Sequence, residues 1–527
     1  MKGLKLIRNI LVALSLIMLG VLIAPRFNKN KPVEKVVDST SWSKLTLILD
    51  QIEKNYVDTI DYSNVIEETI PHLLKELDPH SSYLPPVDLK QATEDLSGNF
   101  DGIGIVFNVP ADTAIVMNVI VGGPSERAGL QSGDRIIKVD DKVVAGQKVP
   151  QDTMLTYMRG PAGTKVTLTV LRKKEFVDFE IIRAKIPIES IDAAYMVNDT
   201  TGYVKLSKFS RTSFKEFLVE VLPMKEKGLK KLIFDLRDNA GGYFDQAILL
   251  SNIFLEKGDE IVYLEGIHRS RQNFKADGSG LLKDIELDVL IDESSASSSE
   301  IFAGAIQDND RGTIYGRRSY GKGLVQECVN FSDKSGIRLT VARFYTPSGR
   351  CIQKPYKTKD GKDYRYDIIE RYAHGEMMEA DSIVKNDSLV FKTKGGRTVY
   401  GGGGIIPDVF VPMDTVGVTD MYIEISTKAL PVKFSMKMGD KYRDELREVK
   451  DLESLYPVFD AMDLEKNFLQ YVLDNGVKFN AKEWKESRKI VITQLKAMIG
   501  RYSPLDDDAF YPIIADVDNV MQKVIEQ

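Results

Sequence analysis

Two polar segments of the chain carry residue types that can perform acyl transfer. The first is a run of small hydroxyl residues between acids, Asp292-Glu-Ser-Ser-Ala-Ser-Ser-Ser-Glu300, and the second is Tyr320-Gly-Lys-Gly-Leu-Val-Gln326. A serine hydroxyl can attack a carbonyl carbon, and a lysine amine can accept its proton if the amine is uncharged. Burial lowers the pKa of a lysine, so Lys322 must be withdrawn from water to act as this base. Together the segments predict a serine nucleophile and a lysine base, with no need for histidine.

The serine run is expected at a turn between a strand and a helix. The apolar stretch 287–291 predicts a buried strand, and apolar residues recur at helical spacing within 300–307. Amides at a helix start lack intrahelical partners and carry the positive end of the dipole, so they can stabilise an oxyanion. The structural alternative is that Ser297-x-x-Glu300 is only a capping box, in which the serine satisfies a helix amide. The residues alone leave both interpretations open.

The spacing of Lys322 and Gln326 imposes a condition on the backbone. In an ideal strand the two residues would lie about 13 Å apart, at roughly 3.3 Å per residue. We therefore predict a bend at the glycines that flank Lys322, which would allow Gln326 to orient the amine.

The remaining composition excludes several other chemistries. The four histidines are His72, His80, His268 and His374, and no HExxH or comparable ligand spacing occurs, so neither a metal nor another cofactor is expected. His80, in Asp78-Pro-His-Ser-Ser82, is expected to have a structural role in a loop after a helix. His268 and His374 are expected on the surface. The formal net charge of −6, without long basic tracts, argues against a nucleic-acid partner.

Seven motifs in a fixed order make the sequence similar to a known family. From about Leu45 to Pro412 the chain resembles the C-terminal processing peptidases, or tail-specific proteases, of bacterial cell envelopes. The motifs are Leu77-Asp-Pro-His-Ser-Ser-Tyr83, Phe100-Asp-Gly-Ile-Gly-Ile105, Asp235-Leu-Arg-Asp-Asn-Ala-Gly-Gly242, the serine run, Gly321-Lys-Gly-Leu-Val-Gln326, Tyr345-Thr-Pro-Ser-Gly-Arg350 and Gly403-Gly-Ile-Ile-Pro-Asp408.

The resemblance implies roles for three catalytic residues. Ser297 would be the nucleophile, Lys322 the general base and Gln326 the residue that orients Lys322. Family members often carry alanine at the position of Ser298, so the adjacent hydroxyls leave a one-position error open.

The resemblance also implies an oxyanion hole. The amide of Ser298 would be joined by an amide of Gly241 or Gly242, in the loop that follows the apolar run 232–234. The alternative for this loop is an ordinary glycine turn, with Arg237 ion-paired to a neighbouring aspartate.

Residues 98–185 have the pattern of a compact, β-rich module that resembles a PDZ domain. Free amides of a glycine loop can capture a carboxylate while the peptide adds a strand to the sheet edge. The predicted peptide-binding residues are Gly102, Ile103, Gly104 and Ile105, although the two isoleucines fit a core role equally well. Arg159 is similar to an arginine that in some members links this domain to the active site, and we predict a regulatory role for it.

The N-terminus has the pattern of a targeting segment. Basic residues precede a mostly apolar run over residues 10–24, which would span about 22 Å as a helix at 1.5 Å per residue. Residues 1–24 are therefore expected to be a signal anchor or a signal peptide, and the poor small-x-small site favours the uncleaved anchor. The resemblance implies a location on the periplasmic side of the cell envelope, anchored to the inner membrane or secreted after cleavage.

These segments define an α/β multidomain plan. We expect a linker (25–41), a helical N-terminal region (42–97), the PDZ domain (98–185), a protease core with a crotonase-like α/β spiral (186–412) and a helical C-terminal region (413–527). The core includes a polar insertion at about 354–399, expected on the surface. Cys328 and Cys351 could form a single disulfide if their Cα atoms approach within about 7 Å.

The function expected from the resemblance is a serine endopeptidase that recognises C-terminal tails of protein substrates through its PDZ domain and cleaves them through an acyl-enzyme. Expected partners are proteins or peptides with free apolar C-termini, an adaptor protein, the membrane and a second copy of the chain. The alternative is a catalytically silent scaffold that binds the tails of envelope proteins. A crotonase-type acyl-CoA enzyme would share the core fold but would need neither the PDZ domain nor the lysine.

Overall fold

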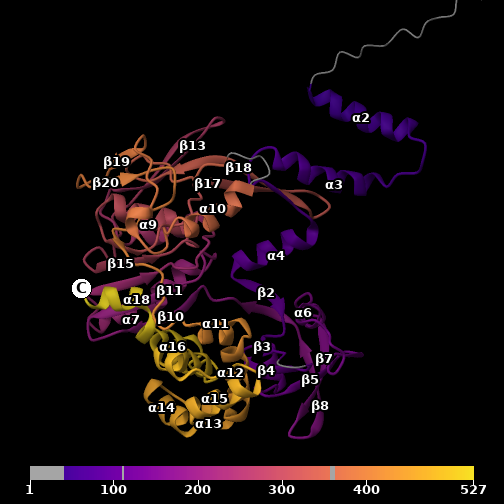
Figure 1. Ribbon diagram of the computed structural model, residues 1–527. Coiled ribbons are helices and arrows are strands. Elements are labelled where there is room, and N and C mark those ends of the chain that lie inside the picture. The colour runs from indigo at the N-terminus through magenta and orange to yellow at the C-terminus, as the bar shows by residue number, and fades with distance from the viewer. Residues whose placement is uncertain (1–40, 110–111, 357–361) are drawn as a thin grey trace, which may run out of the picture. The chain divides into compact units, whose positions relative to one another are not determined.

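The computed structural model describes residues 41–109, 112–356 and 362–527 (Figure 1). The predicted targeting segment, residues 1–24, and residues 25–40 of the linker lie outside the described residues. The chain divides into two compact units, 1–70 and 71–527. Within the three described ranges, every helix is too short or too polar to cross a lipid bilayer.

The first unit contains α2 (Ser41–Asn55) and the beginning of α3 (Tyr62–Lys75). The hydroxyl of Tyr62 donates a hydrogen bond to the carbonyl of Leu49, which joins the two helices. Both helices match the helical pattern predicted for this region.

A six-stranded sheet forms the centre of the second unit. Its strands lie in the order β10 (Ile191–Met196), β11 (Thr201–Leu206), β12 (Lys231–Asp235), β15 (Glu286–Ile291), β16 (Thr313–Gly316) and β21 (Val409–Phe410). All neighbouring pairs are parallel except β10 and β11. The apolar side chains of β12 and β15 are buried, as a sheet covered on both faces requires. Because parallel strands end at the same edge, the loops after β12 and β15 meet there.

Helices cover both faces of this sheet. One core contains Phe217, Phe234 and Phe302, from α7 (Ser213–Glu226), β12 and α9 (Ser298–Asp308), with α8 (Phe244–Asn252) packed alongside. A second core joins the opposite face to α18 (Asn519–Ile525) through Val520, Met521 and Val524. The turn at the start of α9 is therefore held between a buried strand and a buried helix.

A second sheet pairs an N-terminal strand with strands of the region 186–412. Its strands are β1 (Ser82–Leu84), β18 (Gly336–Tyr345), β13 (Glu260–Gly266) and β14 (Arg269–Lys275), and β17 (Leu324–Asn330) pairs with β18. The region 42–97 is mainly helical, as expected, and β1 lies between α3 and α4 (Pro86–Ser97). The backbone of β1 pairs with β18, with Ser82 opposite Arg338.

The β-rich module is joined to the core by a two-stranded stem, β2 (Asn99–Gly102) and β9 (Ala184–Pro187). Its sheet has the order β3 (Ile105–Asn108), β4 (Ala114–Val119), β5 (Arg135–Val139), β7 (Lys165–Arg172) and β8 (Glu175–Ile182), with β6 (Lys142–Val143) paired to β5. The helices α5 (Pro124–Ala128) and α6 (Gln151–Met158) complete the module. At the base of the stem, the amide of Ile188 donates to the carbonyl of Gly98 at 2.9 Å.

The C-terminal region is helical, as predicted. It contains α11 (Asp420–Thr427), α12 (Leu430–Lys441), α13 (Arg443–Arg447), α14 (Leu452–Ala461), α15 (Leu464–Asp474), α16 (Ala481–Gly500), α17 (Asp507–Ile514), the short helix η2 (Ala515–Val517) and α18 (Figure 1). The mixed helix and sheet class, with helical regions at both ends of the described chain, is confirmed.

The described part of the insertion is largely exposed, as predicted, but some of its side chains are buried. It contains α10 (Lys362–Ala373), η1 (Ala380–Ser382), β19 (Val390–Lys392) and β20 (Thr398–Tyr400). Tyr364 is 2% exposed, Arg371 4% and Glu376 3%. The polar composition misled the prediction because the buried charges pair with each other rather than with water.

Candidate functional site

Ser297 occupies the turn between β15 and α9, with φ at +56°. This left-handed backbone is uncommon for a residue with a side chain and is found where a site constrains it. The hydroxyls of three neighbouring serines donate to carbonyls of the loop after β12. These bonds are Ser295 to Leu236 at 2.7 Å, Ser298 to Gly242 at 3.0 Å and Ser299 to Asn239 at 2.8 Å. Those three serines are buried, so among the serines of 295–299 Ser297 alone is partly exposed.

The buried carboxylate of Glu300 connects the serine turn to the lysine loop. Its Oε2 accepts from the amides of Ser297 at 2.9 Å and Lys322 at 2.8 Å. Its Oε1 accepts from the amide of Gly321 at 2.7 Å and the hydroxyl of Ser319 at 2.6 Å. Burial raises the pKa of Glu300, and these four donors act in the opposite direction. The capping and catalytic interpretations are therefore compatible, because one carboxylate caps the turn and also holds the second segment.

Lys322 has the electrostatic environment that a lysine base needs. Burial is the main cause that lowers its pKa, and the charge of Arg338 adds to the effect, while Glu300 and Asp78 oppose it. Gly321 has φ at +88° and β17 begins only at Leu324, so the chain bends where the predicted geometry required it. Among the described residues, no hydrogen bond joins the Ser297 hydroxyl to the Lys322 amine.

Gln326 has a different partner from the predicted one. Its Nε2 donates to the backbone carbonyl of His80 at 2.7 Å rather than contacting the Lys322 amine. At this point the pairing of β17 with β18 is irregular, because Val325 lies opposite Ala342 and Gln326 opposite Thr340, so the extra residue of the bulge is Val341 of β18. The predicted orientation of Lys322 by Gln326 is not present in this conformation.

His80 lies beside the lysine, although the sequence indicated only a structural loop residue. Burial is the main cause that lowers the pKa of His80 to about 4, and the positive charge of Lys322 contributes. Its ring meets the ring of Tyr364 edge-on at 4.8 Å, and its buried Nε2 has no hydrogen-bond partner among the described residues. Its proximity to Lys322 depends on the pairing of β1 with β18, which has no local sequence signature.

Two amides beside Ser297 are free to stabilise an oxyanion. The Gly241 amide donates to the Oδ1 of Asn239 at 2.9 Å and is therefore occupied. Within the described chain, the amides of Gly242 and Ser298 donate to no acceptor. The loop packs tightly on the turn that carries Ser297, since a Cβ on Gly241 would lie 2.8 Å from the Cβ of Ser297. Of the two predicted glycines, Gly242 has the available donor.

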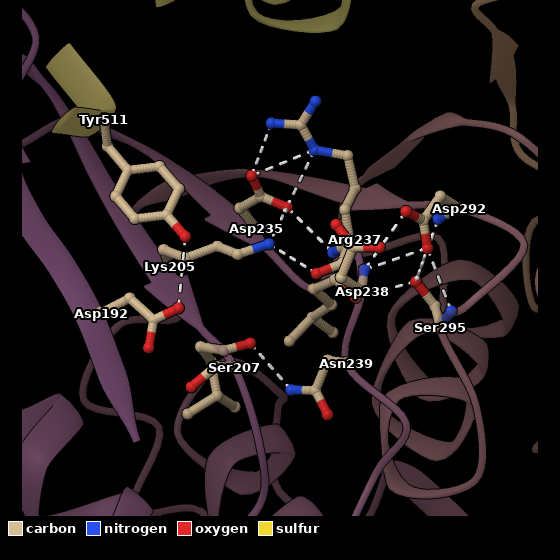
Figure 2. Close-up of polar contacts among 12 residues, drawn as sticks. Asp192, Lys205, Ser207, Asp235, Arg237, Asp238, Asn239, Asp292, Ser295 and Tyr511 are labelled. Atoms are coloured by element: carbon tan, nitrogen blue, oxygen red, sulfur yellow. Dashed lines mark hydrogen bonds and ion pairs between the residues drawn. The ribbon is translucent and has the colours of Figure 1, made fainter. Parts of the chain in front are cut away.

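A buried network of ion pairs holds the loop after β12 in place (Figure 2). Arg237 pairs with Asp235 at 2.6 Å and with Asp518 at 2.8 Å, and Lys205 lies 3.5 Å from Asp235. Burial opposes the charge of Asp235, but Arg237 and Lys205 outweigh it and hold the pKa of that carboxyl well below its usual range. The ion-paired alternative for Arg237 matches this geometry.

Two further side chains join that loop to the site. Asp292 accepts from the amides of Asp238 and Ser295, each at 3.1 Å (Figure 2). Asn239 donates to the carbonyl of Leu206 at 2.8 Å, while its own carbonyl accepts from the amide of Ala296 at 3.0 Å. Sequence reasoning assigned no role to either residue, because each acts on segments far away along the chain.

Comparisons with known proteins agree with this arrangement. The model of peptidase family S41 matches residues 200–362, and the model of the PDZ domain matches residues 102–182. A carboxy-terminal-processing protease of Bartonella bacilliformis is 37% identical over 313 residues, which cover 58% of this chain and 71% of that protein. The chain belongs to the carboxy-terminal-processing protease family.

Other relatives of this family extend the comparison. A probable CtpA-like serine protease of Staphylococcus aureus is 34% identical over 339 residues, covering 62% of this chain and 66% of that protein. The chain thus spans slightly less than two thirds of the staphylococcal relative. The structure of a photosystem II D1 C-terminal processing protease is 24% identical with a TM-score of 0.38, covering 71% of this chain and 87% of that one. Residues 421–503 match the model of a family of unknown function.

The predicted peptide-binding residues of this family member divide between core and edge. Ile103 is 4% exposed and belongs to the core of the PDZ domain, whereas Ile105 is half-buried and opens the edge strand β3. Gly102 ends the stem strand β2, and Gly104 has φ at +75°. Among the described residues, the amides of Ile103 and Gly104 donate to no acceptor, so a loop with two free donors lies next to an open strand edge.

Arg159 and the two cysteines make no contact of the kind considered from the sequence. The Arg159 guanidinium sits over the ring of Phe100 at 4.7 Å, within the PDZ domain, and it contacts neither Ser297 nor Lys322. Cys328 and Cys351 are both free thiols, so the disulfide considered from the sequence is not formed.

Proposed function

We propose that this chain is a serine endopeptidase that grips the C-terminal tail of a protein substrate and cleaves it through an acyl-enzyme at Ser297. The observation that carries the proposal is the position of Ser297. Its side chain is partly exposed while those of Ser295, Ser298 and Ser299 are buried, its backbone φ is positive, and the amides of Ser298 and of Gly242 in the adjoining loop are free. Glu300 fixes its backbone to that of Lys322.

In the proposed reaction, neutral Lys322 takes the proton of the Ser297 hydroxyl as its Oγ attacks the scissile carbonyl. The oxyanion accepts hydrogen bonds from the amides of Ser298 and Gly242. The lysine ammonium then gives its proton to the leaving amine, and the peptide C–N bond breaks to leave an ester on Ser297. A water molecule, deprotonated by Lys322, hydrolyses the ester and restores the serine.

The Ser297 hydroxyl must form a hydrogen bond with the Lys322 amine for this reaction. Catalytic hydrogen bonds are often long without substrate and tighten in the complex, so the lack of a bond between Ser297 and Lys322 is compatible with a resting enzyme. Gln326 would then act at Lys322 after leaving the carbonyl of His80, as the family resemblance implies.

Tail recognition is assigned to the PDZ domain. The terminal carboxylate would accept hydrogen bonds from the free amides of Ile103 and Gly104, while the extended tail pairs with the edge of β3. Ile105 would contact the apolar terminal side chain. We also propose export to the cell envelope, on the basis of the basic and apolar pattern of residues 1–24; fractionation of cells that express the full chain tests this point.

The decisive experiment uses the purified protein and an unfolded protein substrate with either a free apolar or an amidated C-terminus. Wild type should cleave the free-tailed substrate, and amidation should raise KM. Ser297→Ala and Lys322→Ala should abolish cleavage. Ser298→Ala is the matched control and should keep activity within about tenfold, because it loses one hydroxyl hydrogen bond of about 1 kcal/mol.

Three results would overturn parts of the proposal. Cleavage by Ser297→Ala, with loss in Ser298→Ala, would move the nucleophile by one position. Full activity of Lys322→Ala would remove the base. Tail binding by wild type without any turnover would identify the chain as a scaffold.

A further inference from the structure

Buried side chains of helix α10, which belongs to the insertion, contact the loop that carries Lys322. Two side chains of α10 point into this region, Tyr364 and Arg371, and Glu376 follows from the next turn. The insertion is thus packed against the proposed catalytic machinery, a role that the mechanism above does not use.

Two different parts of the molecule bind the backbone of residues 318–322, the lysine loop. Its amides, at Gly321 and Lys322, donate to Glu300. Its carbonyls face the insertion instead. Arg371 donates to the carbonyls of Ser319 at 3.2 Å and Arg318 at 2.5 Å, and the Tyr364 hydroxyl donates to the carbonyl of Gly321 at 3.4 Å.

Arg371 is itself fixed by a buried ion-pair network. Its Nε donates to Glu376 at 2.8 Å, and Glu376 also accepts two bonds from Arg318, each at 2.7 Å. Planar guanidinium groups hold carboxylates in a defined orientation, so this network restricts where the Arg371 donors point. The contact with the lysine loop is therefore a rigid one.

The ring of Tyr364 also reaches the other flank of Lys322. It meets the His80 ring edge-on at 4.8 Å, and the carbonyl of His80 holds Gln326. The Lys354 ammonium lies 4.3 Å from the same ring, and the Lys354 amide donates to the carbonyl of Gly321 at 3.0 Å. The Tyr364 side chain thus contacts both Gly321, which precedes Lys322 in the chain, and His80, whose carbonyl binds Gln326.

We propose that helix α10 is a brace that positions Lys322, with Tyr364 and Arg371 as its positioning residues. Neither residue touches the reacting atoms. The brace binds carbonyls of the lysine loop while Glu300 binds its amides. Together these contacts fix the position of the Lys322 amine and keep water away from it. The predicted effect of the brace on catalysis rests on the proposed function, whereas its predicted effect on the structure of the lysine loop does not.

Tyr364→Leu tests the brace, with Tyr366→Leu and Tyr372→Leu as matched controls. The two control tyrosines lie on the same helix and are 56% and 63% exposed. In Tyr364→Leu, kcat should fall by about 10²-fold, the scale expected when a reacting group is displaced by about 1 Å, while KM changes little. The acid limb of the kcat/KM profile should move to higher pH, because water reaching Lys322 favours the ammonium. Tyr364→Phe keeps the ring contacts and should recover most of the activity.

Hydrogen exchange at the Gly321 and Lys322 amides gives a readout that does not need catalysis. Exchange should accelerate at least about tenfold in Tyr364→Leu and stay at the wild-type rate in both controls. If Tyr364→Leu does not fold, Arg371→Lys, which loses the forked contact, should show the same direction of change. Wild-type exchange and an unshifted pH profile in folded Tyr364→Leu would refute the brace. Failure of wild type to cleave any substrate would refute the proposed function, while the exchange result would still decide the brace.

Discussion

Replacing Glu300 with glutamine should separate the two segments that the carboxylate holds together. The side chain is fully buried and accepts four hydrogen bonds, two at each oxygen. Glutamine keeps one acceptor oxygen and turns an NH₂ group toward donors. The substitution is isosteric, so its effects report on hydrogen bonding and charge rather than on volume.

The magnitude follows from counting the donors that lose their acceptor. In the better orientation, the new NH₂ faces the Ser319 hydroxyl, which can rotate, and only the Gly321 amide is left unsatisfied. One buried unsatisfied donor costs about 1–3 kcal/mol. In the other orientation, the amides of Ser297 and Lys322 both lose their acceptor, at about twice that cost. Since removing a buried charge offsets part of the loss, we expect a fall of about 1–3 kcal/mol in the free energy of unfolding.

The substitution should change both kcat/KM and the pH dependence of cleavage. Loosening of the lysine loop should lower kcat/KM by roughly 10- to 100-fold. The acid limb of the profile should move to lower pH, because the Glu300 charge raises the pKa of Lys322 and glutamine removes it. Peptide cleavage as a function of pH, with urea unfolding of the same samples, measures both components.

Glu327→Gln is the matched control for this experiment. Glu327 lies on β17 with its side chain 49% exposed and pairs with Arg269, and such surface pairs contribute about 0–1 kcal/mol. A Glu300→Gln protein with wild-type kcat/KM, or with an acid limb moved to higher pH, would refute the assigned role of the carboxylate.

Three further changes should have defined outcomes. Asp235→Asn should lower the free energy of unfolding by about 3–5 kcal/mol, measured by chemical denaturation, because it leaves the Arg237 and Lys205 cations short of a buried partner; a loss below 1 kcal/mol would contradict this. His80 binds a proton near pH 6.5 when unfolded but only near 4 when folded, so stability should fall as pH drops through this window; His80→Phe should flatten that fall, and an unchanged pH dependence would count against it. Gly242→Ala should abolish cleavage, because its Cβ would lie 2.1 Å from the Phe209 carbonyl oxygen at a φ of +149°, whereas Gly258→Ala, which is also strained at a φ of +90° but has open space around its Cβ, should not; equal activities would disprove the loop's role.

Local sequence patterns predicted those parts of the site that lie on one continuous segment. The strand-to-helix turn at Ser297 follows from the apolar run before it and the helical spacing after it. The bend at Lys322 follows from its flanking glycines. Each of these depends on backbone preferences within a few residues, which composition and periodicity encode directly.

The missed features all depend on contacts between distant segments. The lysine-side contacts of Glu300 require the 319–322 loop to fold back on α9, and the position of His80 requires β1 to pair with β18. Gln326 was assigned to Lys322 by resemblance, yet it donates to the carbonyl of His80, a residue far away along the chain. The buried part of the insertion was missed because its charges are numerous, but charges that pair in a network can be buried.

The two-stranded stem of the PDZ domain has a practical consequence for protein engineering. The chain leaves the core after Gly98 and returns at Ile188, where the amide and carbonyl are 2.9 Å apart. Residues 99–187 can therefore be excised and the cut ends rejoined by a very short linker, because almost no loop-closure entropy is added. Such a miniature would retain Ser297 and Lys322, the proposed catalytic residues, without the proposed tail receptor, and a different binding domain grafted at the same junction would test whether cleavage can be directed to other substrates.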